Sequence, residues 1–300
     1  MPCFSPVKAW RLPNGGRLVF GDKEPDYLAK RITIPCGQCV GCRLERSRQW
    51  AVRCVLESSL YEDNSFITLT YDDKNLPPGG TLVLKDLQDF LKRLRDRVGY
   101  GRFRYYASGE YGDQFRRPHY HALLFNFDFS DKVFERSSAR GDKLYTSDFL
   151  SEVWGLGRCE IGAVSFNSAA YVARYVVDKV NGDFAERHYQ SVDEWGEIHS
   201  LLPEFSVMSR RPGIGDAWIR KYFRDVYPRD FVVVNGVRCK PPRFFDLKFF
   251  NALTEDFFLD IKDGRADRAF ANSEDNSPDR LLVRQEVLVR RLRSLERKVG

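Results

Sequence analysis

The spacing of apolar residues changes along the chain between the period of a strand and the period of a helix. Short apolar runs bounded by turn residues predict strands, whereas apolar residues three and four positions apart predict helices. The expected strands are 66–71, 102–109, 119–127 and 158–166, and the expected helices are 43–60, 84–98, 146–154 and 168–180. Strands separated by helices and one hairpin predict an α+β fold, with an antiparallel sheet and helices mainly on one face.

Two of the four histidines lie one residue apart in the strand expected at 119–127. Because successive side chains of a strand point to opposite faces, His119 and His121 project from the same face. Two imidazoles held in this way can share one divalent cation. Hard cations favour carboxylate oxygens, so Glu110 is the expected third ligand and Asp113 is the alternative. Glu110 could instead be a solvated carboxylate of the hairpin.

Two tyrosines lie one helical turn apart in the helix expected at 168–180. Tyr171 and Tyr175 are four residues apart and therefore share one face. Lys179, one turn further on, could favour the phenolate or contact a DNA phosphate, and Arg174 is a candidate DNA contact on another face. The tyrosines could instead be packing residues, and the lysine could be solvated. A metal-binding histidine pair followed by a helical tyrosine pair is what metal-dependent DNA cleavage by a tyrosine requires.

Three of the seven cysteines form a C-x2-C-x2-C run, at Cys36, Cys39 and Cys42. No continuous apolar segment of the signal-peptide type precedes them, so disulfides are not expected. With Cys3 as the fourth ligand, the run predicts a structural zinc site. Free thiols and an iron–sulfur cluster are the alternatives, although a ferredoxin run would have its next cysteine where this chain has Arg46. The other three cysteines are expected to be buried thiols.

The charge of the chain fits a nucleic-acid partner without establishing one. The 300 residues include 48 Lys and Arg against 42 Asp and Glu, for a net charge of +6. Arg116 and Arg117 directly precede the histidines and are expected to contact DNA. Residues 262–280 are polar and predicted to be flexible, and 280–298 predict a basic amphipathic helix that binds DNA or a partner, or packs on its own domain. No apolar run is long enough to span a bilayer, so no membrane partner is expected.

These blocks resemble the motifs of the HUH endonucleases, the rolling-circle replication initiators in which U is a bulky hydrophobic residue. The resemblance places the first motif at 66–71, the second at 119–121 and the third at 171–179. The chain is still more similar to the replication initiators of gokushoviruses, small single-stranded DNA phages of the Microviridae. The blocks 36–50 and 209–215 resemble that family too, and the similarity covers roughly residues 1 to 245.

The resemblance implies an HUH endonuclease domain at 61–245 with a ferredoxin/RRM-like core. We expect a Cys-rich zinc-binding element and a helix at 1–60, and a C-terminal helical extension at 246–300. The implied reaction is nicking of single-stranded DNA at the viral origin with Mg²⁺ or Mn²⁺, through a 5′-phosphotyrosine, followed by religation in the host bacterial cytoplasm. No G-x-x-x-x-G-K-[ST] loop occurs, so unwinding requires a partner such as a host helicase.

Three other functions fit parts of the same pattern. A relaxase or a transposase would use the same metal and tyrosine chemistry. A metal-dependent hydrolase would use His119 as a base and would form no covalent adduct. A zinc-containing nucleic-acid-binding protein would tolerate replacement of both tyrosines.

Overall fold

A computed structural model describes the chain except for a few short segments. The segments left out are 1–2, 14–15, 113–114, 139–140, 179–184, 194, 228, 250–254 and 297–300, and only the backbone is described at 174–178, 255–258 and 295–296. The chain divides into two compact units, one formed by Met1–Arg46 with Phe258–Gly300 and the other by Ser47–Phe257. The domain boundaries expected after residues 60 and 245 stay a prediction.

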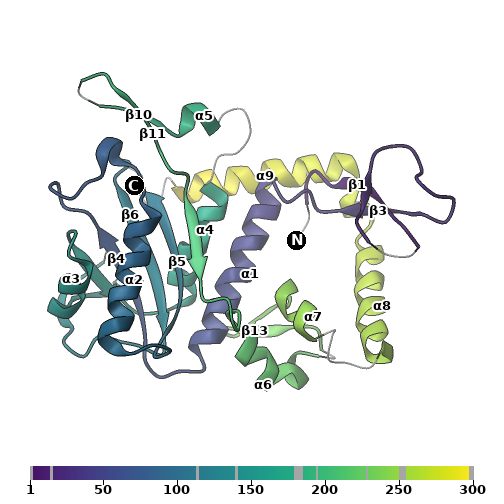
Figure 1. Cartoon of the computed structure of the whole chain (residues 1–300). Helices are drawn as coiled ribbons and strands as arrows, with labels where there is room; N and C mark the ends of the chain where they lie inside the picture. The colour runs from purple at the N-terminus through teal and green to yellow at the C-terminus, as the bar shows by residue number, and fades with distance from the viewer. Residues whose placement is uncertain are drawn as a thin grey trace. The chain divides into compact units, whose positions relative to one another are not determined.

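The larger unit is built on a seven-stranded sheet in which every neighbouring pair is antiparallel (Figure 1). The order is β12 (Phe205–Met208), β5 (Arg104–Tyr111), β6 (Pro118–Phe125), β4 (Asn64–Thr70), β9 (Cys159–Gly162), β8 (Lys143–Thr146) and β7 (Val133–Ser137). The α+β fold with an antiparallel sheet is thus confirmed.

The helices of this unit lie before, between and after the strands of the sheet. They are η1 (Pro78–Gly80), α2 (Leu84–Val98), α3 (Asp148–Trp154), α4 (Phe166–Asp178), α5 (Ala185–His188), α6 (Asp216–Val226) and α7 (Arg243–Phe249), with most of α1 (Val40–Ser58). Two hairpins complete it, β10 (Gln190–Val192) with β11 (Ile198–Ser200) and β13 (Val232–Val234) with β14 (Val237–Cys239).

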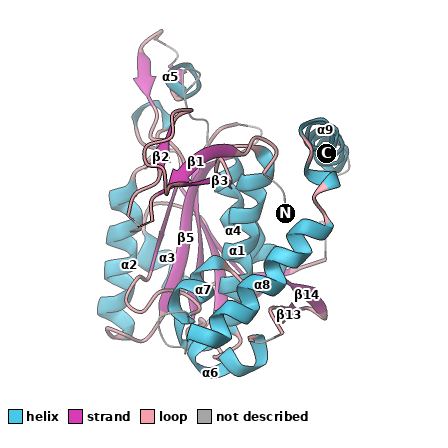
Figure 2. Ribbon diagram, turned by 90° about the vertical axis from the view of Figure 1, so that its right-hand side faces the viewer, coloured by secondary structure: helices cyan, strands magenta, loops and turns pink. Residues whose placement is uncertain are grey.

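Helices cover both faces of the sheet, so the expectation of helices mainly on one face is wrong (Figure 2). On one face, α2 and α3 pack against a core that includes Leu69 and Tyr120. On the other, α1 and α4 pack against Tyr106, Leu123 and Phe125. The physical reason lies in β6, whose residues Tyr120–Phe125 are all buried, as is typical of a strand enclosed on both sides.

Helix α2 has the bounds that its apolar spacing predicts. Its buried residues Leu87, Phe90, Leu91 and Leu94 form one stripe at helical spacing. The helix ends at Gly99, whose φ of 101° suits glycine and whose N–H donates to the carbonyl oxygen of Arg95. The sequence thus determines this element locally.

The smaller unit contains a three-stranded sheet and two long helices. The sheet has the order β2 (Val19–Phe20), β1 (Val7–Arg11) and β3 (Lys30–Ile34), and the helices are α8 (Glu255–Ala271) and α9 (Pro278–Glu296), with η2 (Glu274–Asn276) between them. The terminal helix expected at 280–298 is confirmed by α9. The expectation of a flexible segment at 262–280 is wrong, because most of these residues belong to α8 and η2.

None of the described helices combines the length and the apolar character needed to cross a lipid bilayer.

Candidate functional site

The hairpin of β5 and β6 brings together the three residues that we name the His–Glu site: Glu110, His119 and His121. In the register of the two strands, Glu110 lies directly opposite His119, and Ser108 lies opposite His121. The carboxylate Oε1 of Glu110 is 2.8 Å from Nε2 of His121 and 3.4 Å from Nε2 of His119. One ligand atom from each residue lies within 4.8 Å of the others. These three side chains could therefore hold one metal ion.

Hydrogen bonds behind the imidazoles fix the direction of both rings. Nδ1 of His119 is 3.1 Å from the carbonyl oxygen of Arg117, and Nδ1 of His121 is 3.0 Å from Oγ1 of Thr68. A carbonyl oxygen only accepts, so Nδ1 of His119 carries the proton and Nε2 is the ring's potential metal ligand. Thr68 was not expected at the site. Its signal in the sequence is the alternation of β4, which puts Thr68 and Thr70 on one face.

The site is buried, and its histidines favour the ionised form of Glu110. The side chains of Glu110 and His121 are 8% and 7% exposed. Burial raises the pKa of the Glu110 carboxyl, but the hydrogen bonds and charges of His119 and His121 outweigh it and hold the pKa far below its ordinary value. Glu110 is therefore ionised. One carboxylate and two imidazoles form a donor set that fits a divalent cation.

Helix α4 presents Tyr171 to the His–Glu site. The ring of Tyr171 meets that of His121 edge to face, with centroids 4.9 Å apart and planes at 89°. The helix is anchored by Ala169, Val172 and Ala173, which are fully buried in the core. Tyr171 thus lies on the sheet side of its helix, beside the residues that could hold a metal ion.

A pair of serines caps the N-terminus of α4. Oγ of Ser165 accepts from the N–H of Ser168 at 3.1 Å, and Oγ of Ser168 accepts from the N–H of Ser165 at 2.8 Å. Ser165 is therefore the cap, and Ser168 is its reciprocal partner.

Several expected site residues lie where no side chain is described. The backbone of Tyr175 continues α4 one turn after Tyr171, but its side chain and that of Arg174 lie outside the described residues. Lys179 and Asp113, the alternative ligand, also lie outside the described residues. Their roles stay predictions.

Two clefts meet at Thr68, His121 and Tyr171, which line both. The first, of about 680 Å³, extends toward β8 and the start of α4, where Tyr145 and Ser165 line it. The second, of about 470 Å³, includes His119, Arg117 and Phe115. The His–Glu site and Tyr171 are thus open to a ligand from two sides.

Arg116 and Arg117, expected to contact DNA, are both anchored to the protein. Arg117 donates from Nε and from one terminal nitrogen to the carbonyl oxygen of Tyr71, at 3.2 and 2.8 Å, and pairs with Asp73 at 2.8 Å. Arg116 donates to the carbonyl oxygen of His188 at 3.1 Å. Arg117 lines the second cleft, and the contact of both arginines with DNA stays a prediction.

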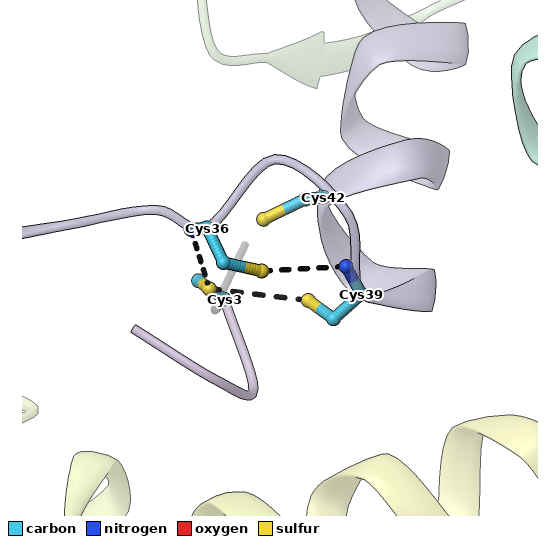
Figure 3. Close-up of side chains that lie close together, drawn as sticks. All are labelled: Cys3, Cys36, Cys39 and Cys42. Carbon is cyan, nitrogen blue, oxygen red and sulfur yellow. Dashed lines mark hydrogen bonds between the residues drawn. The ribbon is translucent and has the colours of Figure 1, made fainter. Parts of the chain in front are cut away.

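The four expected zinc ligands of the smaller unit converge in what we name the cysteine cluster (Figure 3). The sulfur atoms of Cys3, Cys36, Cys39 and Cys42 lie within 4.8 Å of one another. The N–H groups of Cys36 and Cys39 donate to the sulfurs of Cys3 and Cys36 at 3.1 and 3.3 Å. Such N–H···S bonds stabilise thiolates, and four converging sulfurs match the donor set of a tetrahedral structural metal site.

Two thiols of the cysteine cluster have pKa values shifted in opposite directions. Burial raises the pKa of the Cys39 thiol, but hydrogen bonds from the backbone of Cys42 and Phe4 outweigh it and lower that pKa to about 6. Burial, together with the Cys3 and Cys39 side chains, raises the pKa of Cys42 to about 12. Cys39 therefore ionises more readily than Cys42, and a bound cation would supply the positive charge that favours the thiolate of Cys42.

Outside the cluster, two of the three buried thiols that the sequence predicts are confirmed. Cys54 and Cys159 are buried, whereas Cys239 is half-exposed in β14. Cys239 is the last residue of β14, at the end of a short two-stranded hairpin. The expectation is therefore wrong for Cys239.

A third group of metal-ligating side chains lies on the β10–β11 hairpin, at Asp193, Glu197 and His199. Nε2 of His199 is 2.8 Å from Asp193, and the other carboxylate oxygen of Asp193 accepts from the N–H groups of Trp195 and Glu197 at 3.0 and 2.8 Å. These bonds hold the turn, so His199 has a structural role in the hairpin.

Comparisons with known proteins match the segment that holds the His–Glu site. Residues 64–180 match the family model described as replication-associated protein ORF2/G2P. The replication-associated protein VP4 of Bdellovibrio phage phiMH2K is 34% identical over 253 residues, which cover 82% of this chain and 76% of that protein. The replication-associated protein ORF2 of Spiroplasma virus 4 is 32% identical over 288 residues, 88% of this chain and 86% of that protein.

A more distant relative is the replication-associated protein ORF4 of Chlamydia phage 1, 29% identical over 237 residues, 76% of this chain and 56% of that protein. No solved structure matches the chain. The family match lies on the strands and helix that carry Glu110, His119, His121 and Tyr171, and the similarity to the first two relatives extends over most of both chains. The chain therefore belongs to the family of phage replication-associated proteins.

Proposed function

We propose that this protein initiates rolling-circle replication by nicking single-stranded DNA at the viral origin with a tyrosine nucleophile, and that it rejoins the strand. The observation that carries the proposal is the contact of Tyr171 with His121, with ring centroids 4.9 Å apart at the junction of two clefts. A relaxase or a transposase would use the same chemistry, but the relatives are named replication-associated proteins, which favours replication.

The chemistry begins with the phenolate oxygen of Tyr171 or Tyr175, which forms a bond to phosphorus as the bond to the 3′-oxygen breaks. The 5′-phosphate stays on the tyrosine, and the 3′-oxygen takes up a proton and can prime synthesis. Mg²⁺ or Mn²⁺ bound by Glu110, His119 and His121 would offset the charge of the scissile phosphate. A free tyrosine has a pKa near ~10, so the nucleophile needs a positive charge nearby, for which Lys179 is our candidate.

Two tyrosines one turn apart allow a second cleavage while the first tyrosine is still joined to DNA. The free 3′-hydroxyl can then attack the phosphotyrosine, which restores a phosphodiester and releases the tyrosine. This sequence of two strand transfers yields closed circles without an external energy source.

Zn²⁺ is our proposed occupant of the cysteine cluster. Four sulfurs within 4.8 Å of one another match its tetrahedral preference, and Arg46 stands where a ferredoxin run would have its next cysteine. Arg43 and Arg46, at the start of α1, donate to the carbonyl oxygens of Gln38 and Gly37 at 2.9 and 3.5 Å. These arginines thus support the cysteine loop, and the proposed role of the zinc is structural.

Single-stranded DNA is the proposed partner, with Arg116, Arg117 and Arg174 as its contacts. We place the reaction in the cytoplasm of the host bacterium, where the phage genome is copied. The sequence has no G-x-x-x-x-G-K-[ST] loop, so we propose that a host helicase unwinds the duplex.

The decisive experiment is a denaturing-gel assay with Mn²⁺ and single-stranded DNA that contains the phage origin. Wild type should form a protein–DNA adduct, and the double variant Tyr171→Phe/Tyr175→Phe should form none. The single variants assign the two roles. Tyr145→Phe, at a tyrosine that lines the same cleft from β8, is the matched control and should keep the adduct.

Two outcomes would contradict the proposal. Cleavage without an adduct that survives the double change would favour a metal-dependent hydrolase. Binding without cleavage would favour a zinc-containing nucleic-acid-binding protein.

A further inference from the structure

The turn between β5 and β6 carries an exposed aromatic side chain, Phe115, next to the His–Glu site. Its phenyl ring is 86% exposed. Phe115 lines the cleft of about 470 Å³ together with His119, His121 and Tyr171. It also lines an adjoining hollow of about 320 Å³, beside Gly79 and Ser191. A single exposed apolar residue is ordinary on a protein surface, but this one stands between the metal-binding residues and a second hollow.

The backbone next to Phe115 is held in a defined conformation. The N–H of Gly112 donates to the carbonyl oxygen of Arg117 at 3.0 Å, and the N–H of Arg116 donates to that of Gly112 at 2.9 Å. Arg116 has a φ of 49°, in the left-handed region that residues other than glycine seldom adopt. These bonds support that conformation and direct Phe115 outward.

The two arginines that follow Phe115 fix it from one side. Arg117 binds the carbonyl oxygen of Tyr71, and Arg116 binds that of His188. The guanidinium of Arg116 also lies 5.8 Å from the ring centre of Tyr111. The exposed ring is therefore followed by two arginines that are anchored to backbone carbonyl oxygens. Little conformational entropy is lost when a ligand covers a ring held in this way.

We infer that Phe115 stacks on an unpaired nucleobase of the bound strand, beside the phosphate at the His–Glu site. An aromatic ring flanked by basic residues is the arrangement by which proteins hold single-stranded nucleic acid, since every base offers a π-face and every phosphate a negative charge. The two hollows on either side of the ring leave room for the flanking nucleotides. The inference rests on the proposed function and adds a residue that positions the strand.

The test combines a change in the protein with a change in the DNA. The probes are fluorescein-labelled oligo(dT) and an oligonucleotide of the same length with abasic residues, and affinity is measured by anisotropy without added Mg²⁺ or Mn²⁺. Phe115→Leu should weaken binding to oligo(dT) roughly tenfold and leave binding to the abasic strand unchanged, because only a base can stack. Phe115→Trp should restore the affinity for oligo(dT).

Trp195→Leu is the matched control, because Trp195 is 85% exposed but lies near the carboxylates of Asp193 and Glu197. It should bind both strands like wild type. Equal binding of wild type and Phe115→Leu to oligo(dT), or an equal loss on both strands, would overturn the inference and leave the proposed function intact. Failure of wild type to bind either strand would also overturn the inference, whereas the proposed function is decided by the cleavage of origin DNA. Because no cleavage is needed, loss of the covalent adduct alone affects only the proposed function.

Discussion

The His–Glu site and the cysteine cluster both gather metal-ligating side chains, but the first stands on paired strands and the second on loops and the first turn of α1. Eight consecutive residue pairs fix the register of β5 and β6, and this places Glu110 opposite His119. The cysteine cluster depends instead on Cys3, close to the N-terminus, meeting a turn more than thirty residues later, with sulfur atoms such as those of Cys3 and Cys39 3.9 Å apart. The backbone ladder therefore arranges the first donor set, whereas an ion would have to hold the second together.

Removal of metal from the cysteine cluster is the strongest test of this difference. Chelation, or Cys36→Ser, should remove the proposed zinc ion and with it a large part of the ~10 kcal/mol with which small zinc domains bind their metal. Amide protons of β1 and β3 should lose protection against hydrogen exchange, while those of the seven-stranded sheet should keep it. Mass spectrometry of exchange and metal analysis would measure both.

The matched control for this test is Cys239→Ser, at a half-exposed thiol in β14 that should leave metal content and exchange unchanged. Unaltered protection of β1 and β3 in the metal-free protein would show that the loops need no ion.

Loss of a ligand from the His–Glu site should have the opposite signature. His121→Ala should lower the rate of nicking about a thousandfold, because a metal ion at a phosphoryl centre is worth several kcal/mol. The sheet should stay folded by circular dichroism, since its ladder does not depend on this side chain. His188→Ala, at a histidine outside the site, should nick like wild type. A variant at His121 that unfolds would refute the idea that the strands alone arrange the donors.

A smaller change, Thr68→Val, tests whether the contact with Thr68 orients the ring of His121 toward the metal. Valine keeps the shape of threonine but removes the 3.0 Å contact with Nδ1 of His121. The Mn²⁺ concentration for half-maximal nicking should rise about tenfold, the cost of losing a group that orients a ligand, and saturating Mn²⁺ should restore most of the rate.

The same substitution at Thr70, which lies opposite His119 in the register of β4 and β6, provides the control. It should leave the Mn²⁺ dependence unchanged. Equal effects at both threonines would mean that the hydroxyl of Thr68 plays no particular part.

The donor sets were predictable where short-range geometry decides them. The alternation of a strand puts His119 and His121 on one face, and a hairpin brings Glu110 to them. Helical spacing likewise puts Tyr171 and Tyr175 on one face. Each of these inferences depends on residues within one element or two adjacent ones, so the sequence contains all the information they need.

The contacts between segments far apart in the sequence depend on the tertiary structure. The sequence predicts β4 as a buried strand, but only the fold pairs it with both β6 and β9 and brings Thr68 to His121. The edge strand β12 pairs with β5 across about a hundred residues, and all five residues of β7 are exposed, so neither carries a clear local period. The spacing of apolar residues along a single strand also does not predict which helices cover its second face.

The sequence was therefore enough to predict the candidate ligands, their spacing and the helix that carries the tyrosines, because periodicity is a local property of the backbone. The fold decided that Tyr171 meets His121, that helices enclose both faces of the sheet and that Phe115 stands exposed at the cleft. These outcomes depend on strand pairing and packing between residues far apart in the chain, whose energies no local pattern records.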